Sequence, residues 1–159
     1  MKTRLLDTSG ILRTSLDFSC GGFLITGAVL QELESDNARL AVDAGISCGK
    51  IRVHDPSEER IMKVKAAAAA TGDLEKLSET DVGLLAVALE TGSIIVSDDY
   101  NIQNTASVLH IQYEGKTQDG IKRSLVWKKK CIGCGRTYPP ESTVCSVCGS
   151  QLKRKSSAV

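Results

Sequence analysis

Residues 93–104 read Ser-Ile-Ile-Val-Ser-Asp-Asp-Tyr-Asn-Ile-Gln-Asn, a β-branched run that breaks off into two consecutive aspartates. Ile94 to Val96 predicts a short buried strand, and the segment after Asp99 suits a helix. In an open α/β sheet, ligands bind beyond the carboxyl ends of the parallel strands. Asp98 and Asp99 are therefore placed to hold a divalent cation such as Mg²⁺ or Mn²⁺, because these ions prefer oxygen ligands.

On both sides of this stretch, short strands alternate with helices. Strands are expected at residues 3–7, 22–25, 51–53, 94–96 and 108–111. Helices are expected after residue 10, from 28, over 38–44, over 56–70, over 78–91 and from 101. We expect Thr26 and Asp55 to act as helix N-caps and Gly45, Gly72 and Gly92 to end helices. The alternation predicts an α/β fold whose parallel sheet is flanked by helices on both faces.

Composition places the chain among ordinary globular proteins. Of its 159 residues, 42% are hydrophobic and 25% are charged, so disorder is not expected. No apolar run approaches the roughly 20 residues that a membrane helix needs. The N-terminal sequence Leu5-Leu6-Asp7 lacks the design of a signal peptide. The sequence therefore predicts a cytoplasmic protein with no membrane partner.

Charge divides the chain into an acidic body and a basic end. Residues 1–121 carry 11 Lys and Arg against 18 Asp and Glu, whereas residues 122–159 carry 9 Lys and Arg and a single acid, Glu141. A basic segment of this kind predicts an anionic partner, for which nucleic acid is the usual candidate. Residues 115–120 are polar and flanked by glycines, so we expect the body to end there.

The cysteines are distributed as unevenly as the charges. Cys131, Cys134, Cys145 and Cys148 form the pattern C-x2-C-x10-C-x2-C. Four thiolates on two such knuckles make a closed tetrahedral site, the usual arrangement of structural zinc. The C-G-x-x-Y sequence that ends at Tyr138 is similar to an iron-binding rubredoxin; the short gap between the knuckles favours zinc, with iron as the alternative. The two remaining cysteines, Cys20 and Cys48, are expected to be small buried hydrophobes.

Acids at other strand ends and helix starts occupy positions equivalent to Asp99. Asp7 ends the first strand, Glu32 lies early in the helix after the second strand, and Asp81 lies in the first turn of a later helix. Each has a purely structural explanation as well. Asp7 and Asp99 suit helix N-caps, Asp81 suits a capping box with Ser78, and Glu32 suits a solvated helix surface. Converging carboxylates would repel one another unless cations neutralise them, which favours metal-assisted chemistry on a phosphodiester.

Four short motifs resemble the acidic motifs of PIN-domain ribonucleases. They are D-T-S at Asp7, V-L-Q-E at Glu32, S-E-T-D at Asp81 and S-D-D-Y-N-I-Q-N at Asp99. Residues 71–81 and 99–104, with a tetra-cysteine module behind them, more specifically resemble the Nin-one-binding protein family, particularly its compact archaeal members. That family consists of endonucleases that mature the 3′ end of small-subunit ribosomal RNA. The resemblance extends from about Leu5 to Lys155.

The resemblance implies a PIN-like nuclease domain over residues 1–115, a linker over 116–124, a zinc ribbon over 125–155 and a tail over 156–159. It implies that four acids are catalytic and bind Mg²⁺ or Mn²⁺: Asp7, Glu32, Asp81 and Asp99. The motif is anchored on Asp99, so Asp98 is expected either as an extra ligand or as an acid that supports the ligands. Cleavage would leave a 5′ phosphate and a 3′ hydroxyl. Ser9 and Ser97 are expected to hydrogen-bond near the acids. Asp73 belongs to the resembling stretch without an assigned role.

The basic residues around the knuckles are expected to contact RNA phosphates, because they exceed what is needed to offset a four-thiolate zinc site. They are Lys128, Lys129, Lys130, Arg136, Lys153, Arg154 and Lys155. Trp127 and Tyr138 either stack on bases or form the ribbon's small core. The expected partners are precursor small-subunit ribosomal RNA and the assembling small ribosomal subunit. Two alternatives are a toxin-like PIN ribonuclease that acts on tRNA or mRNA, and a non-enzymatic RNA-binding assembly factor.

Overall fold

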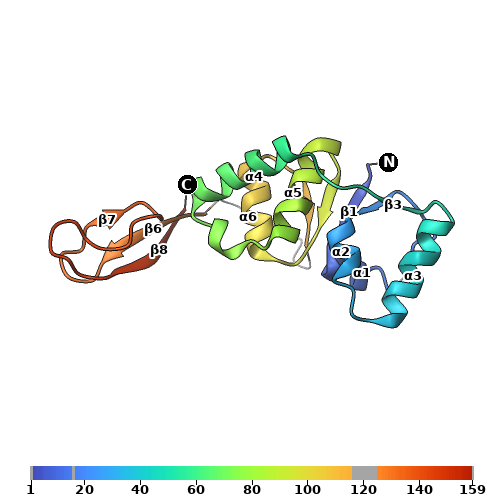
Figure 1. Cartoon of the computed structure of the whole chain (residues 1–159), viewed down its shortest axis with the longest axis horizontal. Coiled ribbons are helices and arrows are strands. Elements are labelled where there is room, and N and C mark those ends of the chain that lie inside the picture. Colours follow the sequence, from blue (N-terminus) through green and yellow to red (C-terminus); the bar gives the residue numbers. More distant parts are fainter. Residues whose placement is uncertain (1, 16, 116–124, 159) are drawn as a thin grey trace.

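The computed structural model describes residues 2–15, 17–115 and 125–158 (Figure 1). The first part of the chain builds a five-stranded sheet in which every neighbouring pair of strands is parallel. Its strands are β1 (Arg4–Leu6), β2 (Phe23–Ile25), β3 (Ile51–Val53), β4 (Ile94–Val96) and β5 (Tyr113–Glu114). Their spatial order is β3-β2-β1-β4-β5. This confirms the predicted α/β fold with a parallel sheet flanked by helices.

The helices come between the strands as the alternation predicted. They are α1 (Thr8–Arg13), α2 (Gly27–Gln31), α3 (Asp36–Ser47), α4 (Glu58–Thr71), the 3-10 helix η1 (Leu74–Lys76), α5 (Glu79–Thr91) and α6 (Tyr100–Val108). Helices α4, α5 and α6 pack against one another, α1 packs against β1 and α3 packs against β3. Central strand residues such as Leu5, Ile25 and Ile95 are fully buried, and they form one core with the apolar faces of the helices.

The strand order reverses direction between β1 and β4. From β1 the chain moves outward through β2 and β3, and it then returns to place β4 on the other side of β1. Leu6 and Val96 are register partners at the ends of these two strands. The next residues, Asp7 and Ser97, therefore leave the sheet side by side. Such a reversal opens a crevice beyond the carboxyl ends of the strands, where open α/β sheets bind their ligands.

The predicted end of α3 was wrong. The helix continues through Gly45 to Ser47. Gly45 serves close packing instead of a helix end, because a Cβ there would lie 2.6 Å from Cδ1 of Ile51. The predicted burial of the two lone cysteines was also wrong. Both are exposed because neither lies within a helix or strand: Cys48 is the C-cap of α3, and Cys20 lies in the turn at residues 19–20 before β2.

The predicted start of α4 was wrong by two residues. Asp55 is not its N-cap, because the carboxylate of Asp55 accepts a hydrogen bond of 2.8 Å from the backbone N of Gly27 at the start of α2. Helix α4 begins at Glu58, with Ser57 as its N-cap. Its end at Gly72 was predicted correctly, since Gly72 adopts the left-handed conformation that glycine favours.

The last strand of the first sheet was predicted too early. Val108 is the final residue of α6, and His110 then turns the backbone with a positive φ of 56°. The backbone N of Ile111 closes this turn by bonding to the carbonyl O of Ala106 at 2.8 Å. Strand β5 follows at Tyr113. The β-branched Val108 locally favours a strand. In the structure it still belongs to α6, the helix that buries Ala106 completely against the core.

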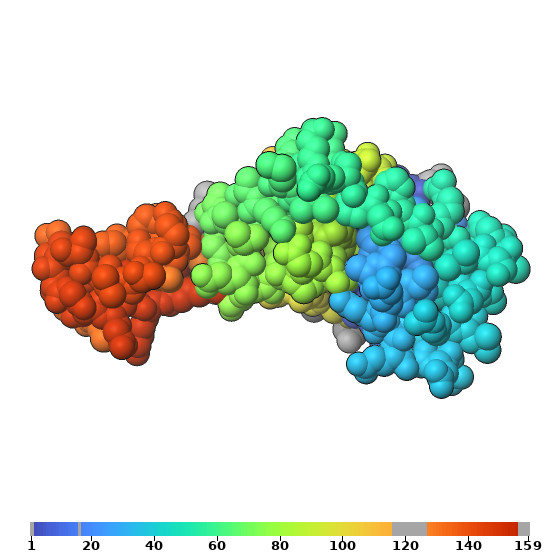
Figure 2. All heavy atoms as spheres, viewed as in Figure 1, coloured from blue at the N-terminus to red at the C-terminus, as the bar shows by residue number. Residues whose placement is uncertain are grey.

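The C-terminal part forms a three-stranded antiparallel ribbon of β6 (Leu125–Cys131), β7 (Thr137–Tyr138) and β8 (Leu152–Ala158), in the order β7-β6-β8. It projects from the end of the body where α4 and α6 lie, as a separate lobe (Figures 1 and 2). Strand β8 includes residues 156–158, which were predicted to form part of a tail. The predicted linker, 116–124, lies outside the described residues. No helix among the described residues is long and apolar enough to span a membrane.

Candidate active site

The predicted acids meet at one cleft at the switch point of the sheet. The cleft has a volume of about 250 Å³. Five carboxylates line it, from the end of β1, the end of α2, the first turn of α5 and the segment after β4: Asp7, Glu32, Asp81, Asp98 and Asp99. Three apolar side chains also line it: Val29, Leu84 and Ile102. The fold therefore brings together acids that lie up to 92 positions apart in the sequence.

Three of these acids cap helices as well as lining the cleft. Asp7 is the N-cap of α1. Asp99 caps α6 by accepting a hydrogen bond of 2.7 Å from the backbone N of Asn101. Asp81 closes a capping box, in which its Oδ2 accepts a hydrogen bond of 2.8 Å from the backbone N of Ser78. A carboxylate has about four lone-pair sites, so each cap leaves acceptor capacity for a ligand.

The N-termini of α5 and α6 both begin at this cleft, since Asp81 and Asp99 stand at their first turns. The positive end of a helix dipole favours negative charge nearby. It therefore offsets part of the repulsion among the acids. The same field favours a phosphate group that enters the cleft.

Asp7 lies among hydrogen bonds from the neighbouring serines. The hydroxyl of Ser9 is 2.9 and 3.1 Å from its two carboxylate oxygens, and it also accepts a hydrogen bond from the backbone N of Asp98. The Ser97 hydroxyl accepts a hydrogen bond from the backbone N of Asp99. Burial raises the pKa of Asp7 above 3.8; hydrogen bonding led by Ser97 opposes the rise, and the charge of Asp98 adds to it.

Asp98 and Glu32 are each held by a side chain that sequence reasoning did not assign. Nη1 of Arg13 lies 3.6 Å from Oδ1 of Asp98. The hydroxyl of Thr80 donates a hydrogen bond of 2.5 Å to Oε1 of Glu32. Glu32 is the C-cap of α2 instead of lying in its first turns, because the helix ends at Gln31. Thr80 thereby connects the acid at the end of α2 to the start of α5. The position of Thr80 inside the S-E-T-D motif was the one feature of the sequence that could have marked it as a site residue.

Gly10 allows α1 to approach the end of β4. A Cβ at this position would collide with the carbonyl O of Val96. That carbonyl also accepts a hydrogen bond from the backbone N of Asp7. This close approach keeps the Ser9 hydroxyl within hydrogen-bonding distance of the Asp7 carboxylate and of the backbone N of Asp98. The D-T-S-G sequence thus needs glycine for space, a requirement that the sequence did not reveal.

The cleft suits a hydrated divalent cation. Mg²⁺ usually binds through one or two carboxylates and keeps several waters. Among the described residues, no three carboxylates have oxygens that all lie within 4.8 Å of one another, whereas the four knuckle cysteines have sulfurs that do. The carboxylates therefore line an open site instead of a closed cage. An open site leaves coordination positions for water and for phosphate oxygens.

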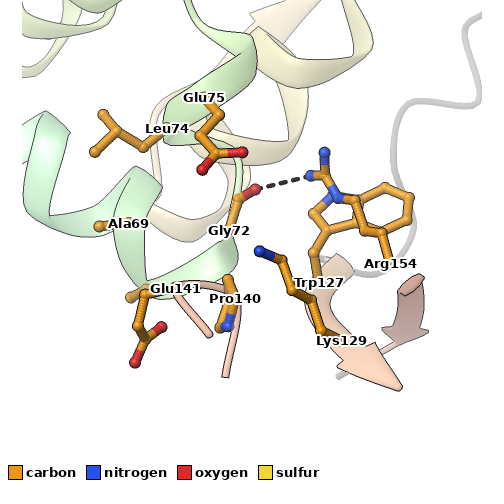
Figure 3. Close-up of a pocket in the computed structure, with 10 residues that line it drawn as sticks. Ala69, Gly72, Leu74, Glu75, Trp127, Lys129, Pro140, Glu141 and Arg154 are labelled. Carbon is orange, nitrogen blue, oxygen red and sulfur yellow. Dashed lines mark hydrogen bonds between the residues drawn. The ribbon is translucent and has the colours of Figure 1, made fainter. Parts of the chain in front are cut away.

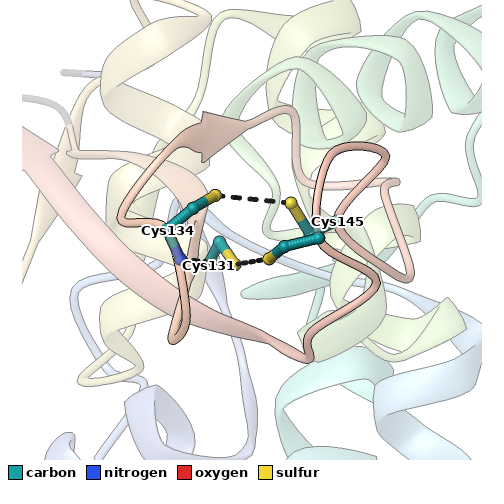
Figure 4. Close-up of side chains that lie close together, drawn as sticks. Cys131, Cys134 and Cys145 are labelled. Atoms are coloured by element: carbon teal, nitrogen blue, oxygen red, sulfur yellow. Dashed lines mark hydrogen bonds between the residues drawn. The ribbon is translucent and has the colours of Figure 1, made fainter.

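The four knuckle cysteines form a compact cluster (Figure 4). Sγ of Cys131 lies 3.4 Å from Sγ of Cys148, and Sγ of Cys134 lies 3.5 Å from Sγ of Cys145. Four sulfurs at about 2.3 Å from one zinc ion would be about 3.8 Å apart, so the spacing fits a tetrahedral metal site. The Tyr138 hydroxyl is 2.9 Å from Sγ of Cys145, and this hydrogen bond is the largest of the causes that lower the pKa of that thiol to about 5; the backbone hydrogen bonds of Val147 and Cys148 add to it.

The basic residues of the ribbon divide between its two faces. Lys128 pairs with Lys155 and Lys130 pairs with Lys153 across β6 and β8, which puts four lysine side chains on one face because alternate residues share a face. All four are exposed. Arg136 is exposed in the first knuckle.

The other face of the ribbon carries Trp127, Lys129 and Arg154. Nζ of Lys129 donates a hydrogen bond of 2.8 Å to the carbonyl O of Ser142. Arg154 contacts the nuclease domain at the carbonyl O of Gly72, and Trp127 contacts it at Lys76. Trp127 is thus half-buried at the junction between the two parts instead of lying free for stacking.

Comparison with known proteins identifies the family. A model of the PIN domain of ribonuclease matches residues 5–91. A Pyrococcus abyssi protein named Endoribonuclease Nob1 is 37% identical over 96% of this chain and 94% of its own length. The chain belongs to the Nob1 family of PIN-domain endoribonucleases. This confirms the resemblance seen in the sequence.

Two further relatives of this Nob1-family chain carry other names. A Thermoplasma acidophilum protein named Ribonuclease VapC1 is 35% identical over 94% of the chain and 76% of the relative. The 20S-pre-rRNA D-site endonuclease NOB1 of Saccharomyces cerevisiae is 32% identical over 71% of the chain and 27% of the relative. All three names describe nucleases that cut RNA.

Proposed function

We propose that this Nob1-family protein is a metal-dependent endoribonuclease that matures the 3′ end of small-subunit ribosomal RNA. The observation that carries the proposal is the convergence of four acids from four elements on one cleft: Asp7, Glu32, Asp81 and Asp99. The name of the yeast relative, which specifies a pre-rRNA site, supports the choice of substrate. The expected partners are precursor ribosomal RNA and the assembling small subunit, in the cytoplasm.

The acids of the cleft would hold Mg²⁺ or Mn²⁺, with Asp98 as a further ligand. A cation bound there supplies Lewis-acid stabilisation of the phosphate and lowers the pKa of water. Ser9 holds the Asp7 carboxylate in place, and Thr80 does the same for Glu32. The N-termini of α5 and α6 face the incoming phosphate with their positive ends.

The ribbon would bind the RNA. Its four cysteines would hold a structural zinc ion, and the Mg²⁺ or Mn²⁺ ion would bind at the acidic cleft. The lysine face of Lys128, Lys130, Lys153 and Lys155, together with Arg136, would contact phosphates, because exposed lysines supply the salt-dependent part of nucleic-acid affinity. In this arrangement the acidic nuclease domain repels RNA in general, and the basic ribbon recruits it.

The main alternative substrate is tRNA or mRNA, as expected of a toxin-like PIN ribonuclease. The relative named Ribonuclease VapC1 supports this alternative. Its match extends beyond the nuclease domain, over 94% of the chain. The presence of the ribbon therefore does not distinguish relatives named Nob1 from the relative named VapC1. Direct comparison of substrates is therefore required.

The experiment is cleavage of an RNA that spans the 3′ end of small-subunit ribosomal RNA and its precursor extension. Reactions contain Mn²⁺, Mg²⁺ or EDTA, and equal amounts of tRNA and an unrelated mRNA serve as competing substrates. We expect cutting at one junction of the ribosomal RNA, with either metal and not with EDTA. Preferential cutting of tRNA or mRNA would support the toxin-like alternative. Binding without cutting, also on precursor small subunits, would overturn the proposal.

A further inference from the structure

A cavity of about 430 Å³ lies where the ribbon meets the nuclease domain (Figure 3). The nuclease domain contributes the end of α4 and η1, and the ribbon contributes Trp127, Pro140 and Arg154. Nη2 of Arg154 donates a hydrogen bond of 2.8 Å to the carbonyl O of Gly72, the residue that ends α4. The same guanidinium lies 4.2 Å from the centroid of the Trp127 ring. Arg154 therefore connects β8, β6 and α4.

Arg154 also reaches a fully buried carboxylate. Its Nη2 is 3.3 Å from Oδ1 of Asp73, whose exposed fraction is 0%. A buried carboxylate is unfavourable unless it is paired and hydrogen-bonded. Oδ2 of Asp73 accepts a hydrogen bond of 2.9 Å from the Thr71 hydroxyl and one of 2.5 Å from the side-chain amide of Asn104. Asp73 thus collects donors from α4, α6 and the ribbon.

These contacts connect the ribbon to α6, the helix that begins at the cleft. Asn104 is itself fully buried and lies on α6, the helix that Asp99 caps. A continuous chain of contacts therefore runs from Arg154 on β8 through Asp73 to Asn104, one and a half turns from a proposed metal ligand.

The two faces of the ribbon have different tasks in this arrangement. The four lysines lie on the face opposite to Arg154, because residue 154 alternates with residues 153 and 155 along β8. Nζ of Lys76, on η1, lies 5.6 Å from the Trp127 ring and adds a second contact across the junction. Within the described part of the chain, the lysine face is exposed, while the other face contacts the nuclease domain.

We infer that Arg154 is a positioning residue: it fastens the ribbon to Asp73 and so sets which phosphodiester of an RNA bound on the lysine face reaches the acidic cleft. The inference rests on the proposed function. It assigns a role to Asp73, for which the sequence offered none. It also separates Arg154 from the phosphate-binding residues among which its charge had placed it.

The first arm of the test uses the single tryptophan of the chain, Trp127, as a probe of the junction. In Arg154→Gln the indole loses the guanidinium that covers it. We expect a red shift of its emission and greater quenching by acrylamide. Lys155→Gln, the adjacent residue on the opposite face, removes the same charge and is expected to change neither. This arm needs no RNA.

The second arm compares two RNAs with the full chain and the metal. One spans the precursor junction and reaches the ribbon, and the other is short enough to occupy only the cleft. For Arg154→Gln, cutting of the long RNA at the junction should fall about tenfold, with cuts spread over neighbouring bonds, because misplacement of a reacting group by about 1 Å has effects of this size or more. Cutting of the short RNA should stay within about twofold of wild type. Lys155→Gln should weaken binding of the long RNA without spreading the cuts.

Asp73→Asn is the second variant, because it removes the charge while keeping the size of the side chain. It should reproduce the emission shift of Arg154→Gln, and the double variant should add little to either. An unchanged emission in Arg154→Gln, or equal losses on the long and short RNAs, would overturn the inference. So would identical behaviour of Arg154→Gln and Lys155→Gln on the long RNA. If the wild type cuts neither RNA, the proposed function fails, while the fluorescence arm still decides whether the junction exists.

Discussion

Leu6 of β1 and Val96 of β4 are register partners on adjacent parallel strands at the centre of the sheet. Leu6 is fully buried and Val96 is almost so. Because each strand ends at this pair, Asp7 and the segment from Ser97 to Asp99 emerge together at the switch point. The pairing of Leu6 with Val96 in the hydrophobic core thus sets where Asp7, Asp98 and Asp99 lie relative to one another.

Asp7→Asn should stabilise the protein when no divalent ion is added. Burial holds the pKa of Asp7 above 3.8, so the folded state binds this proton more tightly than the unfolded state does. The ionised carboxylate therefore lowers stability at neutral pH, and this penalty fades as the pH falls through the folded pKa. Asn keeps the N-cap of α1. In calorimetry, the melting temperature of Asp7→Asn should exceed that of wild type at pH 7, with a smaller difference near pH 4.

Added Mn²⁺ should reverse this order, because an ion that binds only the folded wild type stabilises it. A variant that melts below wild type at pH 7 without added ions would show that Asp7 contributes more through its hydrogen bonds than it costs through burial.

Gly10→Ala should impair both folding and cleavage. The added methyl group collides with the carbonyl O of Val96, so α1 must move away from β4. Overpacking of this kind costs about 1–3 kcal/mol. Gly83→Ala on α5 is the matched control, because its Cβ would meet nothing closer than 3.8 Å. Urea denaturation should show a loss for Gly10→Ala and a gain of up to about 1 kcal/mol for Gly83→Ala. Equal stability of the two variants would contradict the close approach.

Cys148→Ser should unfold the ribbon and leave the nuclease domain folded. Among the hydrophobic residues that the structure describes in the ribbon, only Cys131 and Cys145 are buried, so the ribbon has little core without its metal. Trp127 emission should shift to the red, while the helical circular dichroism signal of the domain should persist. Cys20→Ser, which changes an exposed cysteine far from the cluster, should alter neither signal. A ribbon that stays folded in Cys148→Ser would show that the metal is dispensable.

Lys130→Gln should weaken RNA binding in a salt-dependent manner. A lysine that neutralises one phosphate contributes about one unit to the slope of log affinity against log salt concentration. Fluorescence anisotropy at several salt concentrations should therefore give a slope for Lys130→Gln that is smaller in magnitude than that of wild type by about one. Lys63→Gln, an exposed lysine on α4, should leave the slope unchanged. An unchanged slope in Lys130→Gln would place the RNA away from the lysine face.

Much of the fold and most of the acids could be predicted because their signals are local. Ile94 to Val96 followed by two aspartates, Gly72 and Gly92 after helices, and the capping box of Ser78 all depend on neighbours within a few residues. An acid after a strand or at a helix start also suits a cap, as Asp7, Asp81 and Asp99 show, so it was the resemblance of their motifs to PIN-domain ribonucleases that marked them as site residues. Their convergence needed the strand order, which the local pattern does not contain.

The errors and omissions share a tertiary origin. Gly45 faces Ile51, and Asp55 caps α2 from 28 residues away, so neither carries the local meaning that it would have in isolation. The contact between Arg154 and Asp73 joins residues 81 positions apart. By charge alone Arg154 resembled the lysines beside it. Only the side of β8 on which it lies distinguishes it.

The most direct test of the account compares Asp81→Asn with Asp43→Asn in cleavage of the junction RNA with Mn²⁺. Asn at position 81 keeps the size of the side chain and an oxygen for the cap, whereas Asp43 is an exposed acid on α3 away from the cleft. If the acids of the cleft hold the cation, Asp81→Asn should lose about 10²-fold or more in rate while melting like wild type, and Asp43→Asn should cut normally. A folded Asp81→Asn that cuts at the wild-type rate would contradict the account.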